Sequence, residues 1–200
     1  MIEEDLMKFR KITGSHAGRI LLAAVPVAVI ATVTMAGVAN GAVPVSMAVS
    51  GEQFQIAASL LDGTGFSQYA GTATDTAGKV HQVAIANIAQ ASLTDLCQSV
   101  SAGPVGVMIT AGGGGKPATA TNLQIGMTDL KGDASFGNIR IGVDASTVNT
   151  TPKGTAGDFA QDSDTITIHG VQQTSWSTTA SVFNLNGMHV QLTDGTKTCF

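Results

Sequence analysis

The sequence predicts an all-β domain over residues 43–200, built as a short-stranded, solenoid-like coil or as a sandwich, behind one N-terminal hydrophobic helix. Three observations predict it. Apolar residues alternate with small or polar ones at a period of two, which is typical of strands with one buried face. No stretch after residue 42 keeps a 3.6-residue period. The chain has 24 glycines and only 4% aromatic residues, a composition that suits narrow stacked coils better than a wide sandwich core.

The hydrophobic helix is expected at residues 20–39, which carry no charge. Twenty residues of α-helix rise about 30 Å, which matches the hydrocarbon core of a bilayer. Small residues gather at its end, as they do before a signal-peptide cleavage site, whereas its length favours an uncleaved anchor. Residues 20–42 are therefore expected to be a signal peptide or a transmembrane anchor, with residues 20–39 in contact with the membrane.

The orientation follows from the basic residues. Lys8, Arg10, Lys11 and Arg19 precede the segment, and no Lys or Arg follows it before Lys79. This asymmetry keeps the N-terminus in the cytoplasm. Residues 1–19 are expected to be a short cytoplasmic basic stub, and residues 43–200 the exported β domain, either anchored or secreted on the outer side of the cytoplasmic membrane.

The elements follow from period-two alternation and turn residues. Phe66 and Tyr69 are apolar again after the turn at residues 62–65, and residues 80–96 are expected to be a strand, with a short helix as the alternative. A Gly run before Lys116 and Pro117 lacks the spacing of a phosphate-binding loop and is expected to be a flexible hairpin loop. Strands are expected at residues 43–49, 54–60, 80–96, 105–109 and 190–192, with a turn at residues 62–65.

One short unit recurs in the second half of the chain. Residues 122–126 read Asn-Leu-Gln-Ile-Gly, and residues 138–142 read Asn-Ile-Arg-Ile-Gly. Residues 165–170 end in the same strand-then-glycine form, and residues 184–187 give a weaker copy. A solenoid needs at least three repeats to bury a continuous core, so this repeat favours a coil without establishing one.

The chain contains two cysteines, Cys97 and Cys199. An even number of cysteines in an exported domain predicts a disulfide. The alternative is two free thiols that never meet. A bridge would close a loop of about 100 residues, worth roughly 4–5 kcal/mol in the chain-entropy account.

No motif in the chain predicts catalysis, and no cofactor is expected. The sequence has no G-x-S-x-G elbow of a serine hydrolase. Asp158, Asp162 and Asp164 are weak calcium candidates, since calcium prefers oxygen ligands, but the EF-hand spacing is absent. Residues 43–200 hold six Lys and Arg against eleven Asp and Glu, a net charge of −5. This acidic balance argues against nucleic-acid binding.

Five segments are distinctive, at residues 60–69, 96–100, 110–117, 129–146 and 173–180. Together they resemble a family of exported actinobacterial proteins that is catalogued as a domain of unknown function and is sometimes labelled cholesterol esterase. The likeness spans nearly the whole chain and implies a small multi-span membrane protein as a partner. It supplies no catalytic residues, and the esterase label gains no support from a nucleophile motif.

Three functions are consistent with these observations. The first is a non-enzymatic structural or assembly module of the cell envelope, acting with its own copies or with a membrane partner. The second is a binder of a lipid or other apolar ligand, which would need a cavity lined by residues such as Phe54, Phe66, Phe136 and Phe183. The third, an esterase-type hydrolase, needs a serine or a carboxylate within hydrogen-bond reach of a histidine.

Overall fold

The computed structural model describes residues 46–200, with side chains from residue 50 on. The basic stub at residues 1–19 and the hydrophobic segment at residues 20–39 lie outside the described residues. The described part is all-β, as predicted, and none of its elements is a helix that is long and apolar enough to cross a membrane. Its strands are β1 (Ser46–Val49), β2 (Phe54–Asp75), β3 (Val80–Thr94), β4 (Leu96–Ala102), β5 (Val105–Ala111), β6 (Ala118–Gly137), β7 (Arg140–Asp144), β8 (Phe159–Thr179), β9 (Val182–Asn184) and β10 (His189–Thr193).

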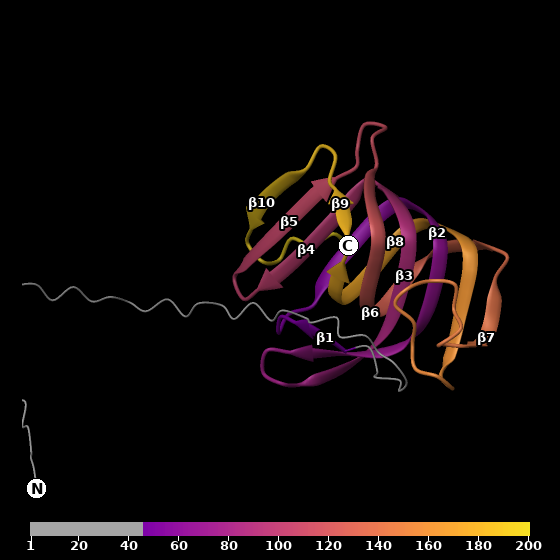
Figure 1. The fold of residues 1–200 in the computed structure, drawn as a ribbon. Coiled ribbons are helices and arrows are strands. Elements are labelled where there is room, and N and C mark those ends of the chain that lie inside the picture. The colour runs from indigo at the N-terminus through magenta and orange to yellow at the C-terminus, as the bar shows by residue number, and fades with distance from the viewer. Residues whose placement is uncertain (1–45) are drawn as a thin grey trace, which may run out of the picture. The chain divides into compact units, whose positions relative to one another are not determined.

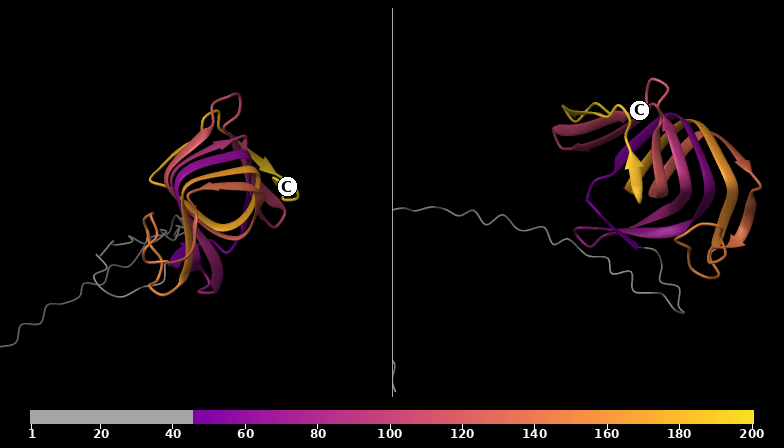
Figure 2. Two further views of the ribbon diagram at one scale, coloured as in Figure 1. Left: turned by 90° about the vertical axis from the view of Figure 1, so that its right-hand side faces the viewer. Right: turned by 45° about the horizontal axis from the view of Figure 1, so that its top comes forward.

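Four long strands close into a small barrel. β2 pairs with β3, β3 with β6, and β6 with β8, all antiparallel. The ring closes where the start of β2 pairs with β8, from Phe54↔Ser175 to Ala58↔Val171. Figures 1 and 2 show these strands curving around a common interior.

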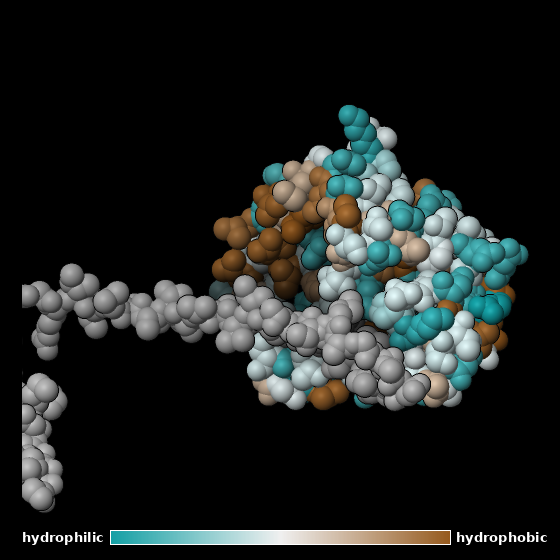
Figure 3. Space-filling view, viewed as in Figure 1, coloured by the Kyte–Doolittle hydropathy of each residue, from teal (hydrophilic) through white to brown (hydrophobic). Residues whose placement is uncertain are grey.

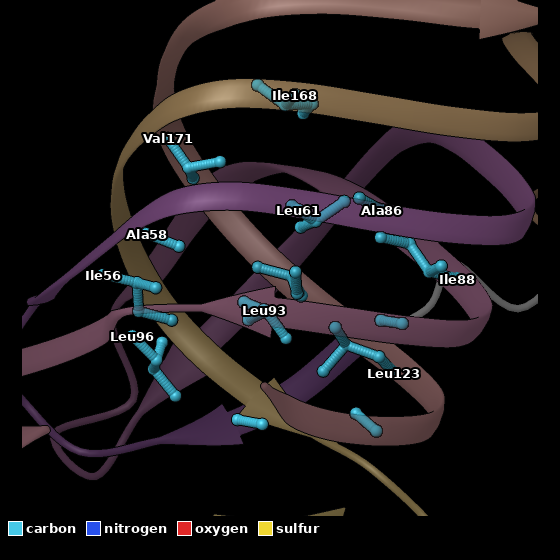
Figure 4. Packing of buried hydrophobic residues seen from close by; sticks show 14 of the residues in the cluster. Ile56, Ala58, Leu61, Ala86, Ile88, Leu93, Leu96, Leu123, Ile168 and Val171 are labelled. Atoms are coloured by element: carbon cyan, nitrogen blue, oxygen red, sulfur yellow. The ribbon is translucent and has the colours of Figure 1, made fainter. Parts of the chain in front are cut away.

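The barrel interior is the main hydrophobic core. Ile56, Leu61, Ile88, Leu123 and Ile168 lie in it, contributed by all four barrel strands (Figure 4). A second cluster lies on the outer face, where the loop at residues 145–158 covers Tyr69, Val83 and Ile85. Apolar residues therefore fill both faces of β2 and β3 in this region, which is why the alternation of the sequence weakens there.

The expected short strands and solenoid or sandwich were wrong, because β2, β6 and β8 are 22, 20 and 21 residues long. The predicted turn at residues 62–65 lies inside β2. Gly65 has φ 65° there, so a glycine bends the strand without ending it. The repeated Asn-x-x-x-Gly units share a backbone conformation, since Asn122 and Asn138 both have positive φ, but they mark irregularities along continuing strand pairs and not solenoid coils.

The strands continue one another across short interruptions. β3 and β4 pair with β2 in one register, Leu60↔Thr94 and Phe54↔Val100, on either side of Asp95. Asp95 has φ 52°, a value that Asp tolerates better than most residues. On the far side, β5 pairs with β4 and β6 with β3, so the Gly run at residues 112–117 is an excursion between two collinear strands and not a hairpin loop.

Candidate functional site: the apolar face of a side sheet

Three strands extend from the barrel as a side sheet, which we define as β4, β5 and β10. β4 pairs with β5, and β5 with β10. In Figure 2 the strands β5 and β10 stand away from the curved barrel strands. The sequence predicted the alternation in β5 and β10 but not that these strands would lie together.

One face of the side sheet is apolar and open. Cross-strand partners lie on the same face of a sheet, and the register joins Val190 to Ile109 and Leu192 to Val107. Val190 is 51% exposed and Leu192 is 77% exposed. Figure 3 shows the resulting apolar patch over β5 and β10. The rows of cross-strand partners on this face continue from β5 through β4 to β2. This face therefore extends the hydrophobic interior of the barrel.

The opposite face of the side sheet is covered by the C-terminal tail. The predicted disulfide is confirmed: Cys97 on β4 is bonded to Cys199. The N–H of Cys199 donates to Ser99 Oγ at 3.1 Å, and Gly195 packs against the backbone of Gly103 and Pro104. Because the tail occupies this face, the apolar face is the one available for contact.

The strands at the two ends of the main strand path, β7 and β10, differ, while the short strands β1 and β9 each pair with one strand beside that path. β7 carries Arg140 and Asp144 and has a register irregularity at Gly142, three devices that discourage pairing with another strand. β10 reads His-Val-Gln-Leu-Thr, with no Lys, Asp, Glu, Pro or bulge. Within residues 46–200, only β5 pairs with β10, so its outer edge is unprotected.

The chain matches a known protein family. The family of unknown function DUF6230 matches residues 50–200. The chain belongs to the DUF6230 family. No curated protein and no solved structure matches the chain. The function of this DUF6230 protein is therefore inferred from the geometry of the side sheet and the barrel.

The interior of the DUF6230 barrel is filled. The enclosed space among Ile56, Leu61, Leu123 and Val171 measures about 10 Å³, close to the size of a single water. A ligand pocket normally has several hundred Å³. The barrel core therefore has no room for an acyl chain.

The four phenylalanines expected to line a lipid cavity lie in different surroundings. Phe66 and Phe136 pack against each other in the core, with ring centroids 5.5 Å apart. Phe54 and Phe183 line an open groove of about 370 Å³ beside Gln98. Phe183 also borders the filled interior, so its ring separates this groove from the core.

The three calcium candidates do not share a site. Asp162 is fully buried and accepts two hydrogen bonds from Arg140, at 2.8 and 2.5 Å, and one from the N–H of Asn149 at 2.7 Å. Asp164 accepts from the side-chain amide of Asn138 at 2.8 Å. Asp158 lies on the loop before β8. Across residues 46–200, no group of three or more acidic, His or Cys side chains is placed to hold a metal ion.

One histidine–carboxylate pair meets the distance criterion given above for a hydrolase. His81 Nε2 lies 2.9 Å from Asp75 Oδ2, and the His81 ring stacks on Trp176 with centroids 3.7 Å apart. Asp75 also accepts the N–H of Ala77 and of Lys79, and together these bonds, with that of His81 first, lower the pKa of its carboxyl. The pair thus builds the turn between β2 and β3, and Asp75 is the hydrogen-bond partner that the described residues give His81.

The outer face of the DUF6230 barrel contains a buried polar network. The side-chain amide of Asn87 donates to Ser67 Oγ and to Tyr69 Oη, both at 3.2 Å, and its oxygen accepts from Gln124. Ser67 also bonds to Thr150 of the covering loop. Burial raises the pKa of the Tyr69 hydroxyl, and the bond from Asn87 partly opposes this. The network ties the covering loop to the barrel, so we assign it a structural role.

Proposed function

We propose that this DUF6230 protein is a non-enzymatic assembly module of the cell envelope, which associates with a second copy of itself through β10 and the apolar face of the side sheet. One observation carries the proposal: β10, a five-residue edge strand without Lys, Asp, Glu, proline or bulge, also holds Leu192, the most exposed large apolar side chain among the described residues.

The edge is self-complementary. In an antiparallel pair of two β10 strands about a two-fold axis at Gln191, Val190 of one copy stands beside Leu192 of the other. The pair joins two three-stranded side sheets into one six-stranded sheet with a continuous apolar face. Leu192 of each copy then packs beside Val190 of the other, which removes part of the most exposed large apolar side chain of the described residues from water.

The proposed location is the outer side of the cytoplasmic membrane, anchored by residues 20–39 or released from them. The hydrophobic segment and the basic residues before it support export. The Cys97–Cys199 disulfide is typical of an oxidising compartment. The multi-span membrane partner implied by the family resemblance stays a prediction.

The test is the mass of the full chain in detergent micelles, measured by sedimentation as a function of concentration. Because each dimer contains two copies of β10, Leu192→Lys places two positive charges at the interface. It removes the partial burial of two leucines, about 2–3 kcal/mol together, and sets like charges at the edge, so we expect association to weaken about 100-fold. Ile141→Lys is the matched control, because Ile141 is 66% exposed on the opposite edge strand β7.

We expect the wild type and Ile141→Lys to dimerise and Leu192→Lys to remain monomeric. Equal dimerisation of all three proteins would refute the proposed interface. A monomeric wild type whose binding to phosphatidylglycerol vesicles is lost in Leu192→Lys would replace self-assembly with the lipid-binding function.

A further inference from the structure

A second open site lies on the barrel away from the side sheet. It is a pocket of about 620 Å³ lined by β2, β3, β6 and the start of β8. None of its lining residues belongs to β4, β5 or β10. It is therefore independent of the proposed self-association.

The floor of the pocket is made by small or buried residues in register. Ala70 on β2 pairs with Ala84 on β3, and Ala84 pairs with Met127 on β6. Farther along β2, the bulky Phe66 fills this face of the strand in the barrel core. At the pocket the two small alanines leave the face open. Met127 is buried, so the floor is apolar.

The rim is polar and carries no cation. Gln68, Gln82 and Gln161 contribute carboxamides, Thr128 a hydroxyl and Asp158 a carboxylate. The Gln161 side-chain N–H donates to the Gln68 carbonyl at 2.7 Å, which holds two of the carboxamides in a fixed arrangement across β2 and β8. The bond leaves the Gln68 N–H₂ and the Gln161 oxygen as a donor and an acceptor side by side.

An aromatic ring stands at the same rim. Phe159 is 64% exposed, which is unusual for so large an apolar side chain. Gly142 lies beside it, and a Cβ at Gly142 would stand 3.9 Å from the ring, an ordinary van der Waals contact. The exposed ring offers an apolar surface next to the carboxamides.

We propose that this pocket binds a neutral saccharide. A pyranose ring has one apolar face, which fits the exposed ring of Phe159, and hydroxyls that both donate and accept hydrogen bonds, which fit paired carboxamides. The lone carboxylate of Asp158 and the absence of Lys, Arg and His from the lining disfavour anionic ligands. The pocket selects for hydroxyl-rich, uncharged rings.

The test uses the full chain in detergent micelles, with chitotriose and cellobiose as neutral probes, glucuronic acid as the anionic probe and sorbitol as the acyclic one. Saturation transfer from protein to ligand reports contact, and titration gives the affinity. We expect transfer to the two neutral saccharides and little to glucuronic acid or sorbitol. We expect Phe159→Ala and Gln161→Leu each to weaken binding about tenfold or more.

Leu192→Lys is the matched control, because it alters an exposed residue outside the pocket and should leave saccharide binding unchanged. Conversely, Phe159→Ala should leave the dimer intact, so the two proposals fail separately. Saccharide binding that persists in both pocket variants, or no transfer to either neutral probe at millimolar concentration, would overturn the inference. Preferential binding of glucuronic acid would do the same.

Discussion

Removal of the Cys97–Cys199 disulfide should destabilise the oxidised protein strongly. The two cysteines are 102 residues apart, so their bond closes most of the described domain into one loop. The chain-entropy account assigns about 4–5 kcal/mol to a loop of this length. For a domain of about 150 residues, each kcal/mol shifts the melting temperature by about 2–4 °C, so Cys97→Ser should lower it by about 10–20 °C.

The assay is thermal unfolding of the full chain, followed by circular dichroism, for wild type and Cys97→Ser made in an oxidising compartment. The same pair is then measured after reduction. The loss should appear only in the oxidised pair, because the reduced wild type already lacks the cross-link. A loss of equal size in both pairs would refute the reasoning and assign the effect to packing of the Cys97 side chain.

Three further predictions concern the barrel. Asn87→Ala should lower the free energy of unfolding in urea by about 2–4 kcal/mol, because the buried Ser67 and Tyr69 hydroxyls lose their shared donor. A loss below about 0.5 kcal/mol, which is typical of surface substitutions, would contradict this. Gly63→Ala should cost about 1–3 kcal/mol, because its Cβ would stand 2.6 Å from a methyl of Ile88, whereas the matched change Gly51→Ala meets nothing within 4 Å and should be neutral. Hydrogen bonds from Ser146 and Gly157 lower the pKa of Asp144, so its stabilisation is complete above about pH 4 and is lost as the pH falls through the lowered pKa. Asp144→Asn should therefore flatten the acid side of the curve of melting temperature against pH, and an unchanged acid side would contradict the assignment.

The fold class could be predicted from the sequence because period-two alternation depends only on which residues face the core. The alternation in β5 and β10 is an example. Strand length could not be predicted. Gly65 and Asn122 are residue types that often end strands. In the structure both have positive φ, but each lies inside a strand that continues on both sides. Only long-range pairing decides whether such a residue ends a strand or bends it.

Part of the candidate site could be predicted from the sequence. Valine and leucine at alternate positions predicted strands with one apolar face, and that pattern is identical whether the face is covered or open. Leu192 is exposed because the tail that ends at Cys199 covers the other face of the side sheet, a fact of tertiary structure. The saccharide pocket gave no signal, because its glutamines lie far apart in the chain and are brought together only by the folding of β2, β3 and β8.

Cross-linking through residue 191 tests the central claim most directly. In the proposed β10 pair, Gln191 faces its own copy, with Cα atoms about 4.5–5.5 Å apart, a spacing that a disulfide can bridge. Gln191→Cys in the full chain should form a 191–191 disulfide under mild oxidation, identified by peptide mapping, while Lys116→Cys in the exposed loop before β6 should not. Failure of Gln191→Cys to cross-link, or equal cross-linking of both variants, would contradict self-assembly through β10.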